Sequence, residues 1–149
     1  ELQSPRAPQQ SSTLLRMDRE SRIRTAIEQD PYATAQGFRL HSVSDDAVTV
    51  EMTVRPDQVN FLGGTHGGVV HSLADCAFSL ASNAYPEDAV AIDTHLAITA
   101  ASDTGDTLTA TAREKTRGRT LATYQVDVAR GDGRVVGLFT GTVFIKPQA

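Results

Sequence analysis

Residues 66–85 read HGGVVHSLADCAFSLASNAY, a stretch that joins a glycine pair to a long apolar segment with one carboxylate, Asp75. Apolar residues cover most of the helical circumference, which predicts a largely buried helix from Gly67 or Gly68 to about Tyr85. Pro86 closes the segment. Many helix residues are alanine or serine, so a curved sheet can approach the helix closely.

Strand patterns flank this helix on both sides. Residues 37–44 and 47–54 are expected to form a hairpin with one buried face on the second strand. After the helix, four ranges rich in Val, Thr, Ile, Phe and Leu are expected to be strands in a meander, with turn residues between them. These ranges are 89–99, 107–115, 120–130 and 134–146.

The N-terminal part is less regular. Residues 1–12 are rich in Gln, Ser and Pro, which predicts a mobile tail, whereas 13–149 are expected to form a single domain. Within it, Leu15, Ile23 and Ile27 indicate a weak amphipathic helix from about 14 to 29 that serves as a packing or dimer accessory. Pro31 is expected to end that helix.

The composition limits the number of domains, the fold class and the kinds of partner that the chain can have. The chain has 149 residues, 40% of them hydrophobic, which suits one core. A curved antiparallel sheet around the helix buries it most simply, so the expected class is α+β. The net charge of −4 and the 5% aromatic content argue against nucleic-acid binding. A single cysteine, Cys76, and the lack of an apolar run near 20 residues predict a cytoplasmic protein without a membrane partner.

The run from His66 to Phe78, with Asn60 before it, resembles the signature of the phenylacetyl-CoA (PaaI-type) thioesterase family of the hotdog superfamily. The run GDTLTATA at 105–112 is similar to the family too, and the likeness covers most of the chain after Gly37. It implies a hotdog fold and hydrolysis of phenylacetyl-CoA or hydroxyphenylacetyl-CoA to the free acid and CoA. It also implies a homodimer or a dimer-of-dimers tetramer. No cofactor is expected, because CoA is part of the substrate.

Two residues carry the expected chemistry. The glycine pair, Gly67 and Gly68, lets a substrate carbonyl approach backbone N–H groups that have no acceptor within the helix. The resemblance assigns the donor to Gly67, and such a donor contributes about 3 to 4 kcal/mol at the transition state. A carboxylate two turns into an apolar helix needs a reason to be there. The resemblance makes Asp75 either a general base that activates water or a nucleophile that forms a transient anhydride.

The spacing of these two residues predicts a shared site. Eight residues of helix separate Gly67 from Asp75, which is about 12 Å along the axis. One thioester cannot touch both in one chain. If both act, the active site combines Gly67 of one subunit with Asp75 of another, as the resemblance implies.

Three further polar residues have two interpretations each. His66 orients the loop or contacts the substrate, or it is purely structural. Asn60 holds the carbonyl or the attacking water, as in related hotdog thioesterases, or it caps its own loop. Ser79 shares a helix face with Asp75 and binds water or the acyl group, or it is a plain buried hydroxyl.

A basic segment supplies a candidate phosphate site. Positive charge gathers at Arg113, Lys115, Arg117 and Arg119 in a chain that is acidic overall. Arginine suits phosphate recognition, so Arg117, Arg119 and Thr120 are candidates for binding the CoA phosphates. The alternative is a solvated hairpin turn.

Other site types find little support. His66 and His71 lie about 140° apart on a helix, which excludes a shared metal-binding face, and Cys76 is expected to be a buried, inert thiol. Ala100 and Ala101 stand where family members place bulkier residues, so a medium-chain or other aryl acyl group stays open. A hotdog hydratase is not supported, because this sequence has no Asp with a His five residues later at a helix start, the arrangement that such enzymes favour. A non-catalytic acyl-CoA sensor would need a fused DNA-binding module, and the N-terminal segment is too short for one.

Overall fold

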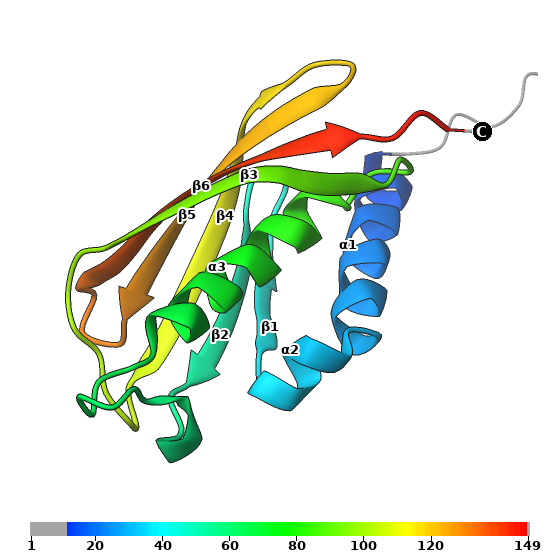
Figure 1. Cartoon of the computed structure of the whole chain (residues 1–149). Helices are drawn as coiled ribbons and strands as arrows, with labels where there is room; N and C mark the ends of the chain where they lie inside the picture. Colours follow the sequence, from blue (N-terminus) through cyan, green and yellow to red (C-terminus); the bar gives the residue numbers. More distant parts are fainter. Residues whose placement is uncertain (1–11, 149) are drawn as a thin grey trace, which may run out of the picture.

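A six-stranded antiparallel sheet curves around one long helix in the computed structural model, which describes residues 12–148 (Figure 1). The predicted α+β class is confirmed. The expected tail lies outside the described residues except for Ser12, where the first helix begins. The elements are α1 (Ser12–Glu28), α2 (Pro31–Gln36), β1 (Arg39–Val43), β2 (Val48–Thr53), the 3-10 helix η1 (Pro56–Gln58), α3 (Gly67–Ser82), β3 (Ala89–Ile98), β4 (Thr107–Arg117), β5 (Leu121–Arg130) and β6 (Val135–Ile145).

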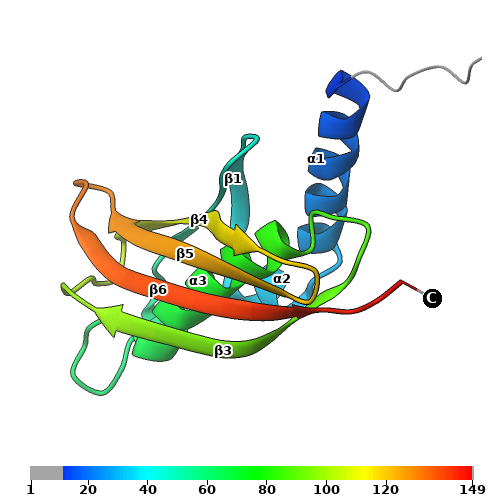
Figure 2. The same ribbon diagram turned by 90° about the horizontal axis from the view of Figure 1, so that it is seen from above.

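The strand order is β1-β2-β4-β5-β6-β3. Strands β4, β5 and β6 form the predicted meander, but the prediction that β3 belongs to it was wrong. β3 pairs with β6 at the far edge of the sheet (Figure 2), and β4 pairs with β2. The segment after β3 leads back past the start of α3, where Thr65 N–H donates to the carbonyl of Ser102 (3.0 Å). Because the chain crosses from β3 to β4 in this way, β1 and β2 lie on one side of the β4–β6 meander and β3 lies on the other.

The core forms between α3 and the concave face of the sheet. The four side chains of the predicted buried face in β2 and just after it are at most 2% exposed: Val48, Val50, Met52 and Val54. Phe78 of α3 packs between Tyr124 and Phe139, with ring centroids 5.6 and 5.5 Å away. Gly141 makes room for it, because a Cβ there would lie 2.7 Å from the Phe78 ring. The long helix is therefore held tightly against β5 and β6.

The N-terminal helices cover one flank of α3 (Figure 1). Ile23 and Ile27 of α1 are buried, whereas the side chain of Leu15 lies outside the described residues. Pro31 was expected only to end α1, but it begins a second helix, α2. Asp30 caps this helix by accepting the N–H groups of Tyr32 and Ala33. Proline suits a first helical position because its missing N–H is not needed there.

The helices among residues 12–148 include none long and apolar enough to cross a membrane.

Candidate active site

The first turn of α3 leaves one backbone donor open. His66 is the N-cap residue, and its Nδ1 accepts the N–H of Gly68 (2.9 Å). Its carbonyl accepts the N–H groups of Val69 (2.9 Å) and Val70 (3.3 Å). The N–H of Gly67 has no hydrogen-bond partner in the described part of the chain. Gly67 is therefore the first-turn residue whose N–H can donate to a ligand, and His66 orients this turn.

Asp75 projects from the middle of α3 and is half-buried. Residues 12–148 donate no hydrogen bond to its carboxylate. Burial raises its pKa, with a smaller raising effect from Asp30, while His71 opposes the shift. A carboxylate kept partly out of water without donors is destabilising unless a ligand or partner uses it. This environment fits a general base or a nucleophile better than a structural ion pair.

His71 is a neighbour of Asp75 that the sequence interpretation missed. It lies four residues earlier on the same helix face, and its Nε2 is 3.3 Å from the Thr94 hydroxyl oxygen of β3. Its ring meets Phe139 edge-on, with centroids 5.4 Å apart. The i, i+4 spacing was visible in the sequence, but His71 was considered there only as a metal ligand. It places an imidazole beside the carboxylate.

Asn60 sits in the loop that precedes α3. Its Oδ1 accepts the N–H of Leu62 (2.9 Å), and its backbone N–H donates to the Gly64 carbonyl (2.8 Å). Asn60 thus caps its own loop, which was one of its two expected roles. Its side-chain NH₂ has no partner among the described residues and remains able to donate.

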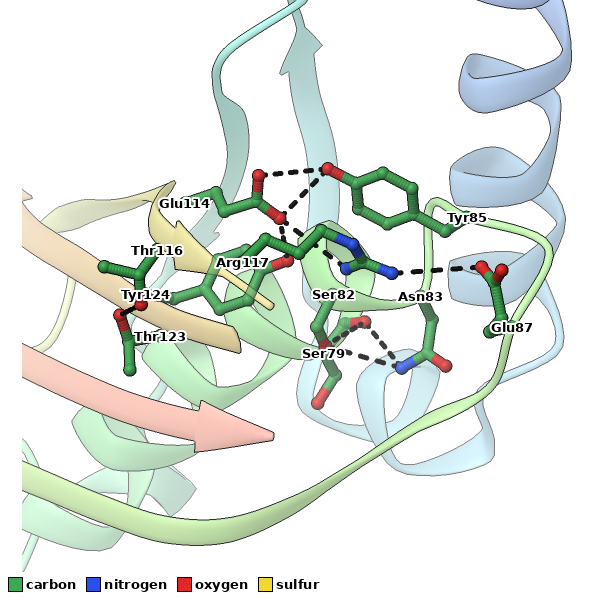
Figure 3. Close-up of polar contacts among 10 residues, drawn as sticks. All are labelled: Ser79, Ser82, Asn83, Tyr85, Glu87, Glu114, Thr116, Arg117, Thr123 and Tyr124. Atoms are coloured by element: carbon green, nitrogen blue, oxygen red, sulfur yellow. Dashed lines mark hydrogen bonds and ion pairs between the residues drawn. The ribbon is translucent and has the colours of Figure 1, made fainter. Parts of the chain in front are cut away.

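Ser79 lies one turn beyond Asp75 and is half-buried. Its carbonyl accepts hydrogen bonds from Asn83 Nδ2 (3.0 Å) and the Ser82 hydroxyl (3.2 Å), which close the end of the helix (Figure 3). Its own hydroxyl has no partner in residues 12–148. Ser79 therefore offers a polar group on the Asp75 side of α3.

The basic residues of β4 do not form the single cluster that was expected. A bulge between Glu114 and Thr116 turns Arg117 toward the same face of the sheet as Glu114. Arg117 pairs with Glu87 (3.8 Å) and Glu114 (3.6 Å), and its guanidinium lies 3.5 Å from the Tyr85 ring centroid (Figure 3). Its charge is thus balanced inside the protein.

Arg119 and Thr120 stand apart from that network. Both are exposed on the β4–β5 turn and line a hollow of about 480 Å³ together with Lys146 of the C-terminal segment. Neither the Arg119 nor the Lys146 side chain makes an ion pair with a described residue. Glu87 and Arg117 also line this hollow but pair with each other (3.8 Å), so the positive charges of Arg119 and Lys146 are left without an ion pair there.

The described residues offer neither a metal site nor a reactive thiol. Within residues 12–148, no three His, Cys, Asp or Glu side chains gather as a metal site. Cys76 is buried, and burial raises its pKa to about 12. Its thiol is therefore protonated and unreactive at neutral pH.

Comparisons with known proteins identify the family of this chain. A family model described as the thioesterase superfamily matches residues 62–137. The chain belongs to the thioesterase superfamily. A putative esterase of Deinococcus radiodurans is 42% identical over 113 residues, which cover 75% of this chain and 77% of the relative. The acyl-coenzyme A thioesterase PaaI of Escherichia coli is 34% identical over 114 residues, covering 76% and 81%.

Solved structures extend the likeness of this thioesterase to the whole fold. The PaaI protein of the Escherichia coli phenylacetic acid degradation operon superposes with a TM-score of 0.86 at 30% identity, covering 91% of this chain and 98% of that one. A hypothetical thioesterase from Streptococcus pneumoniae, solved with coenzyme A, gives 0.71 at 26% identity, covering 76% and 91%. The predictions of a hotdog fold, a PaaI-type member and a thioester-hydrolysing enzyme are confirmed.

Proposed function

We propose that this thioesterase hydrolyses an acyl-CoA to the free acid and CoA, with phenylacetyl-CoA or hydroxyphenylacetyl-CoA as the substrate. One observation carries the proposal: the N–H of Gly67 and the half-buried carboxylate of Asp75, both on α3, have no hydrogen-bond partner among residues 12–148. The names of two similar proteins support the substrate class, since one is an acyl-CoA thioesterase from a phenylacetic acid operon and the other holds coenzyme A.

The chemistry follows from these groups. The Gly67 N–H, aided by the positive end of the helix dipole, polarises the thioester carbonyl and stabilises the oxyanion. The free amide NH₂ of Asn60 is a second donor. The Asp75 carboxylate either takes a proton from the attacking water or attacks the carbonyl carbon itself. In the second route water then cleaves the anhydride, and in both routes the CoA thiolate leaves. No cofactor is needed.

The site requires two chains. Gly67 and Asp75 lie on one continuous helix, about 12 Å apart along its axis, so a thioester reaches Gly67 of one subunit and Asp75 of another. The exposed edge strand β3 supports a homodimer, because no other strand of residues 12–148 pairs with its outer edge and Val90, Ile92 and Ile98 are 40, 59 and 55% exposed. A dimer of such dimers gives the alternative tetramer.

The remaining residues bind the substrate. Arg119 and Thr120, with Lys146, receive the CoA phosphates. The one carboxylate that lines their hollow, Glu87, pairs with Arg117, which leaves the charges of Arg119 and Lys146 without an ion pair among the described residues. Arg117 also lines that hollow, where its ion pairs with Glu87 and Glu114 hold its side chain in place. Gly68 leaves room beside the His66 ring, and the Ser79 hydroxyl faces the water or the acyl group.

The test is thiol release from a panel of acyl-CoAs by the wild type, Asp75→Asn and the control Asp127→Asn, which changes an exposed carboxylate of β5. We expect Asp75→Asn to lose at least about 100-fold in kcat and the control to match the wild type. Undiminished turnover by Asp75→Asn would remove the assignment. Binding without turnover in the wild type would favour a non-catalytic acyl-CoA sensor. Faster turnover of medium-chain thioesters would replace the aryl substrate.

A further inference from the structure

Helix α2 brings an aromatic ring to the helix face that carries Asp75. Asp30 caps α2 through the N–H of Tyr32 (3.0 Å), so the first turn of α2 fixes the backbone of that tyrosine. The hydrogen bond between the side chains of Tyr32 and Ser72 brings the start of α2 to the first half of α3.

The hydroxyl of Tyr32 is tied to α3. It lies 2.9 Å from the Ser72 hydroxyl oxygen, and that hydroxyl in turn donates to the carbonyl of Gly68 (2.7 Å). Ser72 has only one proton to give, so Tyr32 is the donor in the first bond. Ser72 lies four residues after Gly68 and three before Asp75. The ring of Tyr32 is therefore anchored at the turn between the expected oxyanion site and the carboxylate.

The ring itself is held but not covered. Its edge meets Phe38, with centroids 6.4 Å apart and planes at 77°. Even so, Tyr32 is 55% exposed, whereas Phe38 is 6% exposed. Tyrosine on a protein surface gives a rigid apolar face at low cost in conformational entropy, which suits a binding wall. Phe61 and Phe144 are also exposed aromatics, but of these three residues Tyr32 is the one whose hydroxyl is bonded to α3.

We propose that Tyr32 is a specificity-determining residue, whose ring forms a wall of the acyl pocket beside Asp75 and favours an aryl over an alkyl acyl group. The inference rests on the proposed function and names a residue for its acyl preference. An offset or edge-to-face contact between the ring and an aryl group discriminates against an alkyl chain by roughly 2- to 10-fold. The hydroxyl serves only to hold the ring in place.

The experiment compares kcat/KM for phenylacetyl-CoA and hexanoyl-CoA in the wild type and three variants. Tyr32→Leu keeps apolar bulk but removes the ring, Tyr32→Phe keeps the ring but removes the hydrogen bond, and Thr34→Ala is a control on the exposed side of α2. We expect Tyr32→Leu to lower the phenylacetyl to hexanoyl ratio roughly 2- to 10-fold. Tyr32→Phe and Thr34→Ala should keep that ratio.

A second measurement, inhibition by the free acids phenylacetate and hexanoate, tests binding of the acyl group apart from turnover. Phenylacetate should inhibit Tyr32→Leu more weakly than it inhibits Tyr32→Phe, while hexanoate inhibits the two alike. An unchanged ratio in Tyr32→Leu, including an equal loss on both substrates, would overturn the role of Tyr32 and leave the proposed function standing. No thiol release by the wild type from any acyl-CoA would overturn the proposed function, and the inference with it.

Discussion

Replacing Gly67 by proline would delete the proposed oxyanion donor with little change to the helix. Gly67 is the first residue of α3, a position where proline is common because its N–H has no role in the helix. His66 has φ −62° and ψ 130°, the extended conformation that a residue before proline adopts. A Cβ at position 67 would meet only the flexible end of Ile98, whose Cδ1 lies 3.0 Å away. The fold should therefore accept Gly67→Pro.

The matched control is Gly67→Ala, which adds the same Cβ and keeps the N–H. Within residues 12–148, only one first-turn N–H has no partner, since His66 accepts the other three, so no neighbouring backbone donor can replace it. Loss of one such donor costs about 2.7 to 4 kcal/mol, or about 100- to 1000-fold in kcat. We expect that loss in Gly67→Pro, and a change of no more than about 5-fold in Gly67→Ala.

Steady-state thiol release gives kcat and KM for both variants, and thermal melts followed by circular dichroism show whether each is folded. The predicted loss lies in kcat, because the donor acts on the charge that develops in the transition state. A folded Gly67→Pro protein with the kcat of Gly67→Ala would refute the role of this N–H.

Three other predictions follow from the same geometry. Mixing Gly67→Pro with Asp75→Asn subunits should restore about one quarter of wild-type activity, since half of random dimers are hybrids with one intact site; no recovery after subunit exchange contradicts a shared site. Burial raises the pKa of Asp75, so wild-type stability should fall as pH rises from the pKa of the unfolded chain to that of the folded state. Urea titrations of Asp75→Asn should lack this fall. Gly141→Ala, whose Cβ would lie 2.7 Å from Phe78, should lower the free energy of unfolding by about 1 to 3 kcal/mol, while Gly131→Ala should not.

The central helix and the strands were predictable because their signals are local. The apolar pattern after Gly67 marks α3, and the alternation from Val48 to Val54 marks the buried face of β2. The position of β3 was not predictable in this way. Consecutive strands usually pair, whereas β3 lies at the far edge of the sheet and pairs with β6, a long-range contact that the local residue pattern does not encode.

In the candidate site too, some residues were predictable from local sequence and others were not. Gly67 and Asp75 stand out locally, as a glycine at a helix start and a charge in an apolar helix. Arg117 does not, because a bulge in β4 reverses the direction in which its side chain points, and strand alternation cannot show a bulge. His71 could have been found, since the i, i+4 rule pairs it with Asp75 on one helix face.

Helix α3 therefore carries two unfinished half-sites. Its first turn uses every N–H but that of Gly67, and its middle holds a carboxylate that no described residue satisfies. The helical rise keeps these groups about 12 Å apart, too far for one thioester. A two-fold axis between two such helices would bring each Gly67 to the Asp75 of the other chain, so two chains would complete two sites at once. If the site is shared as proposed, catalysis requires assembly, and a monomer is expected to be inactive even when it is fully folded.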